Sequence, residues 1–432
     1  MLNSFKIERV RAIEILDSRG NPTLQVEVFT KDSYGRAAVP SGASTGQHEA
    51  IELRDGDTAR FGGKGVLQAI KNVDEFLAKS IIGMDCREQK QIDESLITLD
   101  GTPNKARLGA NAILGVSLAV ATAAANTARK PLYKTLRQQS RYVLPVPMMN
   151  IINGGKHAGN NLAIQEFHIM PIGFTDFLEA LRAGVEIYHS LGTVIQNKYG
   201  MVGRNVGDEG GFAPPMTQSR EAFDAILQAI ENAGYAVGKE IAVAIDAAAS
   251  EFYNEEKYAI DGRKLKASEL VDYYSTLCEE YPLVSIEDPF EENDYDHFKA
   301  LTKAKGKTVQ IIGDDIFVSN PRRLQRGIDI GAANALLLKV NQIGTLTEAL
   351  HSADLAMENH YSVIVSHRSG ETEDSFIADL VVALSCGQIK TGAPARSDRT
   401  AKYNRLISIA HELGSAARFP GHEFRQCFPK RE

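Results

Sequence analysis

Residues 335–339 read Ala-Leu-Leu-Leu-Lys, an apolar run of four residues that stops at a charged side chain. Similar runs recur along the second half of the chain, at 242–245, 283–286, 309–312, 335–338 and 363–365 and at Ile389. Short continuous apolar runs are typical of strands that are buried on both faces. Helical stretches such as 268–280 and 344–357 separate most of them. This alternation predicts an α/β fold with a (β/α)8-type barrel.

An open, doubly wound sheet is the alternative arrangement of repeated βα units. Such a sheet is expected to carry a glycine fingerprint after an early strand. The nearest candidate, Phe-Gly-Gly-Lys-Gly at 61–65, matches neither the dinucleotide-binding pattern nor the phosphate-binding-loop pattern. We interpret this segment as a turn, and the barrel remains the prediction.

The first part of the chain follows a different pattern. Residues 23–28 alternate with period two, as a half-buried strand does, and a second strand is predicted to end near Val39. From Val66 to about Gln138 the spacing is mostly helical, and strands followed by helices indicate an α+β unit. A chain of 432 residues is too long for one ordinary core. We predict a smaller α+β domain over 1–139 that caps the site, followed by a barrel domain over 140–432.

The segment 109–128 has no charged residue and is long enough to cross a bilayer. It is mostly alanine, which favours helix and contributes little to membrane insertion. We therefore predict a helix buried between other helices of a soluble protein, with no membrane partner.

The remaining composition argues against an exported protein and against a nucleic-acid-binding protein. The four cysteines form no CxxC pair, so we interpret them as packing thiols in a reducing compartment. Charged residues from Glu8 onward interrupt the N-terminus before an apolar signal core develops. The net charge of −7 argues against nucleic acid as a partner. We expect a cytoplasmic protein.

Charged or ionisable side chains directly follow the apolar runs. In a barrel, the C-terminal ends of the strands converge on one mouth, where such enzymes carry out their chemistry. One acidic residue after a strand is commonly a helix cap. Lysine and arginine do not cap helix N-termini, so capping does not account for the whole set. The side chains concerned are Asp246, Glu287, Asp314, Lys339, His367, Arg368 and Lys390.

Three of these side chains, Asp246, Glu287 and Asp314, are carboxylates with no His or Cys among them. Hard oxygen ligands select Mg²⁺ over zinc or copper. Lys339 follows the next run and is the candidate base. A lysine pKa of about 10.4 is too high for this role, so we expect Mg²⁺ and Lys390 to lower it by like-charge repulsion.

Eight motifs make the chain resemble the enolases, in family order from about residue 8 to the end. Any one motif is weak, whereas all eight together are highly specific. They are Ser-Gly-Ala-Ser-Thr-Gly (41–46), Asn-Gly-Gly-Lys-His-Ala-Gly (153–159), Gln-Glu-Phe (165–167), Gly-Asp-Glu-Gly-Gly (207–211), Ser-Ile-Glu-Asp-Pro (285–289), Leu-Lys-Val-Asn-Gln (338–342), Ser-His-Arg-Ser-Gly-Glu-Thr (366–372) and Lys-Thr-Gly-Ala-Pro (390–394).

The resemblance implies a lyase that interconverts 2-phospho-D-glycerate and phosphoenolpyruvate in glycolysis. Lys339 would remove the C2 proton, and Glu209 would protonate the leaving hydroxyl. Two Mg²⁺ ions are implied per site, the second binding with substrate. The first would be held by Asp246, Glu287 and Asp314, and the second by Ser41. The implied substrate-binding residues are His157, Gln165, Glu166, Glu287, Asp314, His367, Arg368, Ser369 and Lys390.

Two further expectations concern the environment of the site. The small residues of 41–46 suggest a mobile lid that excludes water when it closes. A neighbouring carboxylate is expected to raise the pKa of Glu209, so that it keeps a proton.

Two rival functions remain open at this point. Another member of the same superfamily, such as a racemase or cycloisomerase, would act on a different carboxylate; Arg368 beside Ser369 favours phosphate instead. A binding protein on the same scaffold, such as a surface receptor or an RNA-processing partner, would be favoured by a lost ligand, and none is lost. The resemblance also implies a homo-oligomer, either a dimer or an octamer, and some relatives have a secondary cell-surface or secreted pool.

Overall fold

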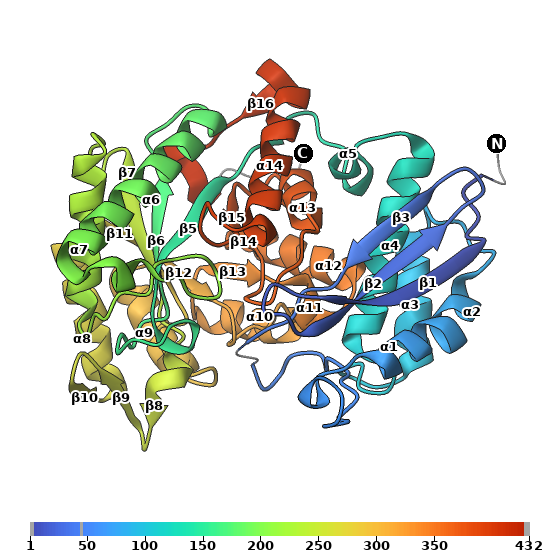
Figure 1. Ribbon diagram of the computed structural model, residues 1–432, viewed down its shortest axis with the longest axis horizontal. Helices are drawn as coiled ribbons and strands as arrows, with labels where there is room; N and C mark the ends of the chain where they lie inside the picture. The colour runs from blue at the N-terminus through green and yellow to red at the C-terminus, as the bar shows by residue number, and fades with distance from the viewer. Residues whose placement is uncertain (1–3, 44–45, 427–432) are drawn as a thin grey trace.

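The computed structural model describes residues 4–43 and 46–426, and within them eight strands close into a barrel. The barrel forms the larger part of the molecule, and a separate blue sheet with its helices lies beside it (Figure 1). The predicted barrel preceded by a smaller α+β unit is confirmed. Around the barrel the strands run β11 (Leu283–Glu287), β12 (Gln310–Gly313), β13 (Ala335–Leu338), β14 (Ser362–Ser366), β15 (Gln388–Lys390), β5 (Val146–Asn153), β6 (Glu166–Pro171) and β7 (Ile241–Asp246).

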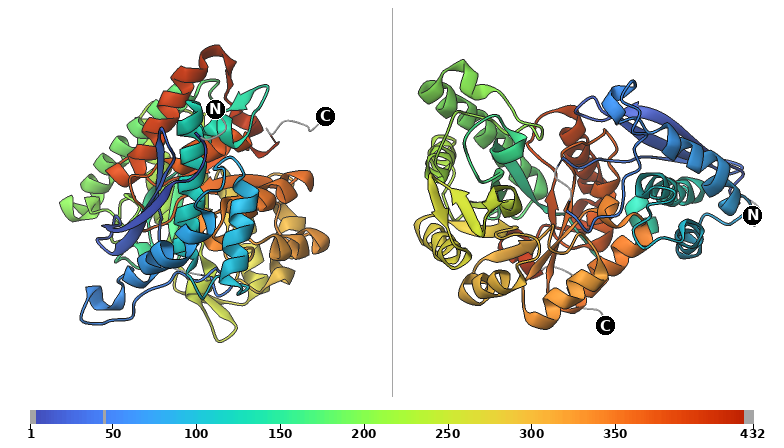
Figure 2. Two further views of the ribbon diagram at one scale, coloured as in Figure 1. Left: turned by 90° about the vertical axis from the view of Figure 1, so that its right-hand side faces the viewer. Right: turned by 90° about the horizontal axis from the view of Figure 1, so that it is seen from below.

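Helices cover the outside of this barrel, as the views from two further directions show (Figure 2). Apolar side chains on alternate strand positions divide into two clusters, one inside the barrel and one between the barrel and its helices. In β13, for example, Leu337 points into the inner cluster, whereas Leu336 and Leu338 belong to the outer one. Burial on both faces explains why these strands are continuous apolar runs.

The covering helices follow the strands in chain order. They are α6 (Phe177–Tyr199), α7 (Ser219–Asn232), α8 (Ala267–Glu280), α9 (Tyr295–Lys305), α10 (Pro321–Ile330), α11 (Val340–Ile343), α12 (Leu346–Glu358), α13 (Phe376–Leu384) and α14 (Ser397–Leu413). Short strands lie outside the barrel: β8 (Tyr253–Asn254), β9 (Lys257–Ile260) and β10 (Arg263–Leu265) form one sheet, and β4 (Tyr142–Val143) pairs with β16 (Ala417–Arg418).

Strand β6 departs from a simple repeat of βα units, because it runs antiparallel to both β5 and β7. No α-helix lies between β5 and β6. A parallel pair of strands needs a long crossover connection between them, whereas an antiparallel pair can be joined by a shorter loop. As a result β6 begins, rather than ends, at the mouth. Its first residue, Glu166, pairs in register with Asp246, the last residue of β7.

The N-terminal unit is an antiparallel sheet in the order β1 (Arg9–Leu16), β2 (Pro22–Phe29), β3 (Tyr34–Ala38). Strand β2 and the end of β3 match the predicted strands, and β1 is a third strand that the sequence reasoning did not identify. The helices are α1 (Leu67–Asn72), α2 (Ala78–Ile81), α3 (Gln89–Asp100), α4 (Ala110–Ala128) and α5 (Leu132–Leu136). The domain boundary at 139/140 stays a prediction; α5 ends shortly before it and β4 begins shortly after it.

Helix α4 is the apolar segment that is long enough to cross a membrane. Of its most apolar 18-residue window, 83% is buried inside the protein. The helix packs on β2 and β3 as well as on α3 and α5, so it lies between a sheet and helices rather than among helices alone. The close approach of β3 to α4 explains why α4 is rich in alanine. A Cβ at Gly35 in β3 would lie only 2.0 Å from the backbone nitrogen of Ala123 in α4. Small residues on both elements permit this close approach.

Three of the four cysteines lie in the described part of the chain, and all three are free thiols. Burial raises the pKa of Cys86 and of Cys386 to about 12, and that of Cys278 to about 11. They are therefore packing thiols, as predicted. Cys427 lies outside the described residues.

Candidate active site

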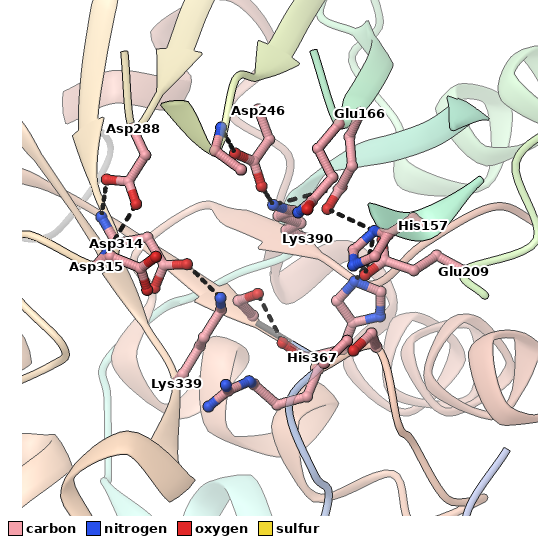
Figure 3. Close-up of a pocket in the computed structure, with 16 residues that line it drawn as sticks. His157, Glu166, Glu209, Asp246, Asp288, Asp314, Asp315, Lys339, His367 and Lys390 are labelled. Carbon is pink, nitrogen blue, oxygen red and sulfur yellow. Dashed lines mark hydrogen bonds and ion pairs between the residues drawn. The ribbon is translucent and has the colours of Figure 1, made fainter. Parts of the chain in front are cut away.

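The strand ends at the mouth surround a small cavity (Figure 3). All but two of the predicted site residues line it, although they come from all parts of the barrel sequence. The predicted residues on the cavity wall are His157, Gln165, Glu166, Glu209, Asp246, Asp314, Lys339, His367, Arg368, Ser369 and Lys390. The two that do not line it are Glu287, which is fully buried, and Ser41.

On one side of the cavity, Lys339 forms a close ion pair with Asp314. Gln342 donates to the other oxygen of Asp314 over 2.8 Å and holds the carboxylate in place. Burial acts to lower the pKa of Lys339, whereas the charges of Asp314 and Glu287 act to raise it, and in the chain alone the pKa is raised. Lys390 acts in the predicted direction, and the lowering expected from Mg²⁺ together with Lys390 stays a prediction.

Lys390 lies at the centre of a second cluster of charges. Its Nζ is 2.8 Å from Asp246 Oδ2, 2.7 Å from Glu287 Oε1 and 3.4 Å from Glu166 Oε2. Burial alone would raise the pKa of Asp246, but Lys390 lowers it to about 2. For Glu287, burial and the charge of Asp246 raise the pKa well above its ordinary value.

The carboxylates fit a hard divalent metal ion. Asp246, Glu287 and Asp314 stand at the ends of the adjacent strands β7, β11 and β12, and the second oxygen of Glu287 is buried without a hydrogen-bond partner among the described residues. Such an oxygen is costly to bury unless it is paired or coordinates a cation. Oxygen atoms of Asp288, Asp314 and Asp315 also lie within 4.8 Å of one another.

Asp288 and Asp315 line the cavity but were not among the predicted site residues. Asp288 accepts hydrogen bonds from the backbone N–H groups of Asp314 (2.9 Å) and Asp315 (2.8 Å), so it orients the turn that presents Asp314. The signal was present in the sequence, since each is an acidic residue next to a predicted ligand. Nothing in the sequence alone separates such a supporting carboxylate from a ligand.

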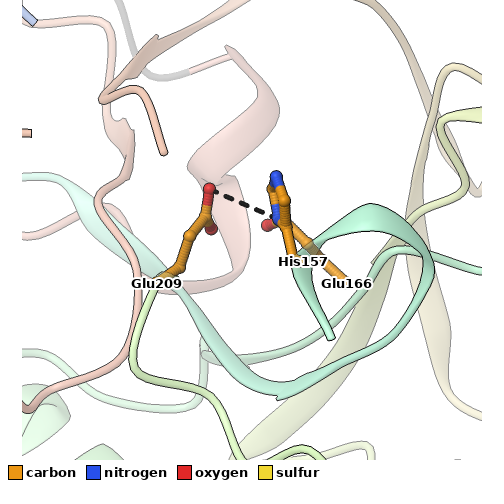
Figure 4. A group of neighbouring side chains, drawn as sticks. All are labelled: His157, Glu166 and Glu209. Carbon is orange, nitrogen blue, oxygen red and sulfur yellow. Dashed lines mark ion pairs between the residues drawn. The ribbon is translucent and has the colours of Figure 1, made fainter. Parts of the chain in front are cut away.

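The other side of the cavity joins a histidine to two carboxylates (Figure 4). His157 Nδ1 lies 3.7 Å from Glu166 Oε1 and 3.7 Å from Glu209 Oε1. A second histidine, His168, lies 2.9 Å from the other oxygen of Glu166. Burial lowers the pKa of His157, and it lowers that of His168 to about 3, so both rings are neutral near pH 7.

The two carboxylates of this cluster differ in pKa. Burial and the charge of Glu209 raise the pKa of Glu166 well above its ordinary value. Burial acts in the same direction on Glu209, but His367 and His157 outweigh it and lower its pKa well below the ordinary value. The amide of Asn150 also donates to Glu209 over 3.1 Å, which favours the ionised form. The direction for Glu209 is thus opposite to the predicted raised pKa, and Glu166 is the carboxyl group of the pair whose pKa is raised.

The guanidinium of Arg368 forms a third part of the wall. It binds the carboxylate of Glu49 in a bidentate pair, with distances of 3.0 and 3.1 Å, and it donates to Asn341 Oδ1 over 3.0 Å. Glu49 belongs to the N-terminal unit, so this pair joins that unit to the barrel mouth. The sequence reasoning missed Glu49, because it stands 319 residues away from its partner.

Ser41 lies behind the wall, not on it. Its Oγ accepts hydrogen bonds from Arg19 and Arg54, each over 3.2 Å, and its backbone pairs with Gly370. The predicted lid, 41–46, includes Ser44 and Thr45, which lie outside the described residues. The lid therefore stays a prediction.

With this geometry in place, comparison with known proteins decides the family. The family model "Enolase, N-terminal domain" matches residues 7–136, and "Enolase, C-terminal TIM barrel domain" matches 141–428. The chain belongs to the enolase family. Among curated relatives, an enolase of Methanocaldococcus jannaschii is 60% identical over 98% of this chain and 99% of its own length. An enolase of Pyrococcus furiosus is 59% identical over 99% of this chain and 100% of its own length.

Membership of the enolase family confirms the resemblance drawn from the motifs, and it settles the choice against another branch of the superfamily. The roles of the individual residues are a separate matter, and they follow as a proposal.

Proposed function

We propose that this chain is a phosphopyruvate hydratase, which interconverts 2-phospho-D-glycerate with phosphoenolpyruvate and water in glycolysis. The observation that carries the proposal is the cavity itself. It combines Lys339 on one side with His157, Glu166 and Glu209 on the other (Figure 3). Arg368 also lines it. Removing a proton from carbon while expelling a poor leaving group requires a base and an acid at separate positions.

Lys339 is the proposed base. Loss of the C2 proton, which moves to the amine of Lys339, leaves an ene-diolate with negative charge on the substrate carboxylate. A dianion of this kind needs concentrated positive charge around it. Lys390, buried beside Asp246 and Glu287, is placed to pair with the carboxylate.

Magnesium is the proposed cofactor, with two ions per site and the second binding together with substrate. Asp246, Glu287 and Asp314 would hold the first ion, and Ser41 would contribute to the second. When bound, the ions would add positive charge near Lys339 and the substrate, which lowers the pKa of the amine and stabilises the dianion. The donor set of oxygen atoms supports this choice of metal.

The second half of the reaction breaks the bond between C3 and its hydroxyl, which leaves as water. We assign the protonation of this hydroxyl to Glu209, supported by His157 and His367. Because the pKa of Glu166 is the raised one of the pair, we propose that Glu166 holds a proton at rest and passes it to Glu209 as substrate binds. Glu166, Gln165 and the two histidines surround the hydroxyl in this proposal.

Arg368 and Ser369 are the proposed phosphate ligands. The guanidinium presents a planar fork that suits phosphoryl oxygens. Glu49 occupies two of its donors, so it holds the fork in a fixed orientation and limits the net positive charge there.

The finer properties of the assembly and its location also belong to this proposal. We propose a homo-oligomer, a dimer or an octamer, in the cytoplasm, with a small-molecule substrate and neither nucleic acid nor membrane as partner. Exposed apolar side chains support an interface between copies, since Val202 is 71% and Met201 is 65% exposed. Sedimentation velocity of the purified protein tests the oligomeric state, and a monomer would contradict it.

The central experiment is direct. Purified protein with Mg²⁺ and 2-phosphoglycerate should form phosphoenolpyruvate, which is measured by its ultraviolet absorbance. A racemase or cycloisomerase would leave that absorbance unchanged and alter a different carboxylate. Absence of phosphoenolpyruvate from folded, magnesium-loaded protein would contradict the proposal.

A further inference from the structure

Arg399 is a completely buried arginine near the start of α14, and no role has been given to it so far. Its guanidinium lies behind the histidine side of the cavity. Nη1 donates to His367 Nδ1 over 2.6 Å and to the carbonyl of Arg368 over 2.6 Å. Nη2 donates to the carbonyls of Asp208 over 3.1 Å and of Ser369 over 2.5 Å. One side chain therefore joins the loop that carries Glu209 to the segment that follows β14.

The backbone around Arg399 is built to admit its side chain. Gly392 has a φ of +79°, and a Cβ at this position would lie 2.9 Å from Arg399 Cδ, 2.9 Å from the carbonyl oxygen of Glu209 and 3.1 Å from His367 Cε1. The missing side chain of Gly392 thus leaves room for Arg399 to pass between Glu209 and His367. The Nε of Arg399 lies 2.7 Å from Asp398 Oδ2 in an ion pair that lacks hydrogen-bond geometry, so Nη1 and Nη2 make the hydrogen bonds of this side chain.

The contact with His367 fixes which ring nitrogen carries the proton. A guanidinium can only donate, so Nδ1 must accept and must be unprotonated. In a neutral imidazole the single proton then lies on Nε2. Nε2 is 3.3 Å from Glu209 Oε2 and has no well-aligned hydrogen-bond partner among the described residues. It is therefore a donor that faces both Glu209 and the cavity.

We propose that Arg399 is a positioning residue, which holds His367 in the Nε2–H tautomer and fixes the Glu209 loop against the Arg368–Ser369 segment. It acts on the reaction through these residues and does not touch the substrate. The mechanistic part rests on the proposed role of Glu209, because the Nε2–H group is a donor for that carboxylate or for the substrate hydroxyl. The opposite tautomer would present a bare nitrogen to both, which repels a carboxylate oxygen.

The tautomer can be measured without substrate or metal. In protein labelled with ¹⁵N-histidine, NMR shifts separate a protonated ring nitrogen from a bare one, and the His367 signals are assigned by their loss in His367→Gln. We expect a bare Nδ1 and a protonated Nε2 in the wild-type protein near pH 7. A protonated Nδ1 would overturn the proposal, and this result needs no Arg399 variant to fold.

The variant Arg399→Met tests the consequence. We expect a second tautomer of His367 to become visible and dehydration at saturating substrate to fall by about 100-fold, as small misplacements of catalytic groups do. Exchange of the C2 proton should stay within about threefold of wild type, since Lys339 and the metal ligands are untouched. An unchanged tautomer, or an equal loss of exchange and dehydration, would overturn the proposal.

Arg405→Met is the matched control. Arg405 lies on the same helix and pairs with Asp379 at 2.7 Å, away from the cavity. We expect this variant to lower thermal stability but to leave the His367 tautomer and the dehydration rate as in wild type. A shifted tautomer in this control would overturn the proposal, because general loosening of α14 would then explain the effect. Failure of the wild-type protein to form phosphoenolpyruvate would refute the proposed function alone, since the tautomer is read independently of turnover.

Discussion

The two sides of the cavity differ in the charged groups that they bring into contact. On the lysine side each charge touches its opposite: Lys339 contacts Asp314, Lys390 contacts Asp246 and Glu287, and Arg368 contacts Glu49. On the histidine side, His157 is 3.7 Å from both Glu166 and Glu209, whereas His168 is 2.9 Å from Glu166. The first side pairs carboxylates with lysine or arginine, and the second pairs carboxylates with histidine rings.

This difference shows how one cavity can contain both a base and an acid. Pairs of titratable groups whose surroundings push their pKa values apart mark acid and base assignments. Here the pKa of Glu166 is raised and that of Glu209 is lowered, although both are buried. Burial and the charge of Glu209 account for the first direction, and His367 with His157, acting against burial, accounts for the second.

Removing the metal should have the largest effect, because it leaves the lysine side without the charge that stabilises the intermediate. Exhaustive chelation should abolish phosphoenolpyruvate formation, and added Mg²⁺ should restore it. Asp314→Ala should weaken metal binding sharply in calorimetry, whereas Asp296→Ala, at an exposed position on α9, should not. Full turnover after chelation would contradict this prediction, because the lysine side would then stabilise the intermediate without a metal ion.

Lys339→Ala should rank next. Exchange of the C2 proton with solvent deuterium, followed by NMR, should fall by about 10⁴-fold, the upper range for the loss of a general base. The fold should be retained, as judged by circular dichroism. If exchange continued at the wild-type rate, the base would be Lys390 or a histidine, and the assignment of the two sides would have to be revised.

The two carboxylates of the histidine side should respond unequally to the same substitution. Glutamine resembles a protonated carboxyl group, and the proposal places the resting proton on Glu166, whose pKa is raised. Glu166→Gln should therefore reduce dehydration by about tenfold, well below the 10²–10⁴-fold range expected when a general acid is lost. A larger loss in Glu166→Gln than in Glu209→Gln would reverse the assignment of the proton.

The smallest expected effect concerns stability and pH. Burial lowers the pKa of His367 from its ordinary value of 6.5 to about 4. The unfolded chain therefore binds the proton first, and stability is lost as pH falls from 6.5 towards 4. Between pH 6.5 and 5, His367 should contribute a loss of about 2 kcal/mol in the free energy of unfolding. The variant His367→Gln should lack this contribution.

Denaturant unfolding at several pH values measures this slope. His189→Gln is the matched control, because His189 is exposed on α6. An equal reduction of the slope in both variants would show that the buried position of His367 has no special effect.

The sequence was sufficient to predict the parts of the fold that depend on local pattern. Buried strands are continuous apolar runs, so Ala335–Leu338 and its counterparts predicted the barrel, and the residue after each run predicted its mouth. Glu166 does not follow an apolar run, because it begins an antiparallel strand. It was predicted only through the enolase resemblance.

Contacts between distant segments were beyond the sequence. Glu49 reaches Arg368 across 319 residues, and Arg399 reaches Asp208 across 191. The pKa directions of Lys339 and Glu209 in the chain alone also depend on such contacts. Asp314 acts to raise the first, and His367 with His157 acts to lower the second, and the sequence reasoning took none of these contacts into account.

The ratio of C2 proton exchange to dehydration in Glu209→Gln tests the division between the two sides most directly. Both rates are measured on one sample with saturating substrate and Mg²⁺, exchange by NMR in deuterium oxide and dehydration by ultraviolet absorbance. We predict that dehydration falls by about 10²–10⁴-fold while exchange remains measurable, since Lys339 and the metal ligands are intact. Equal losses in both rates would contradict the account, because base and acid would then not act as separate groups.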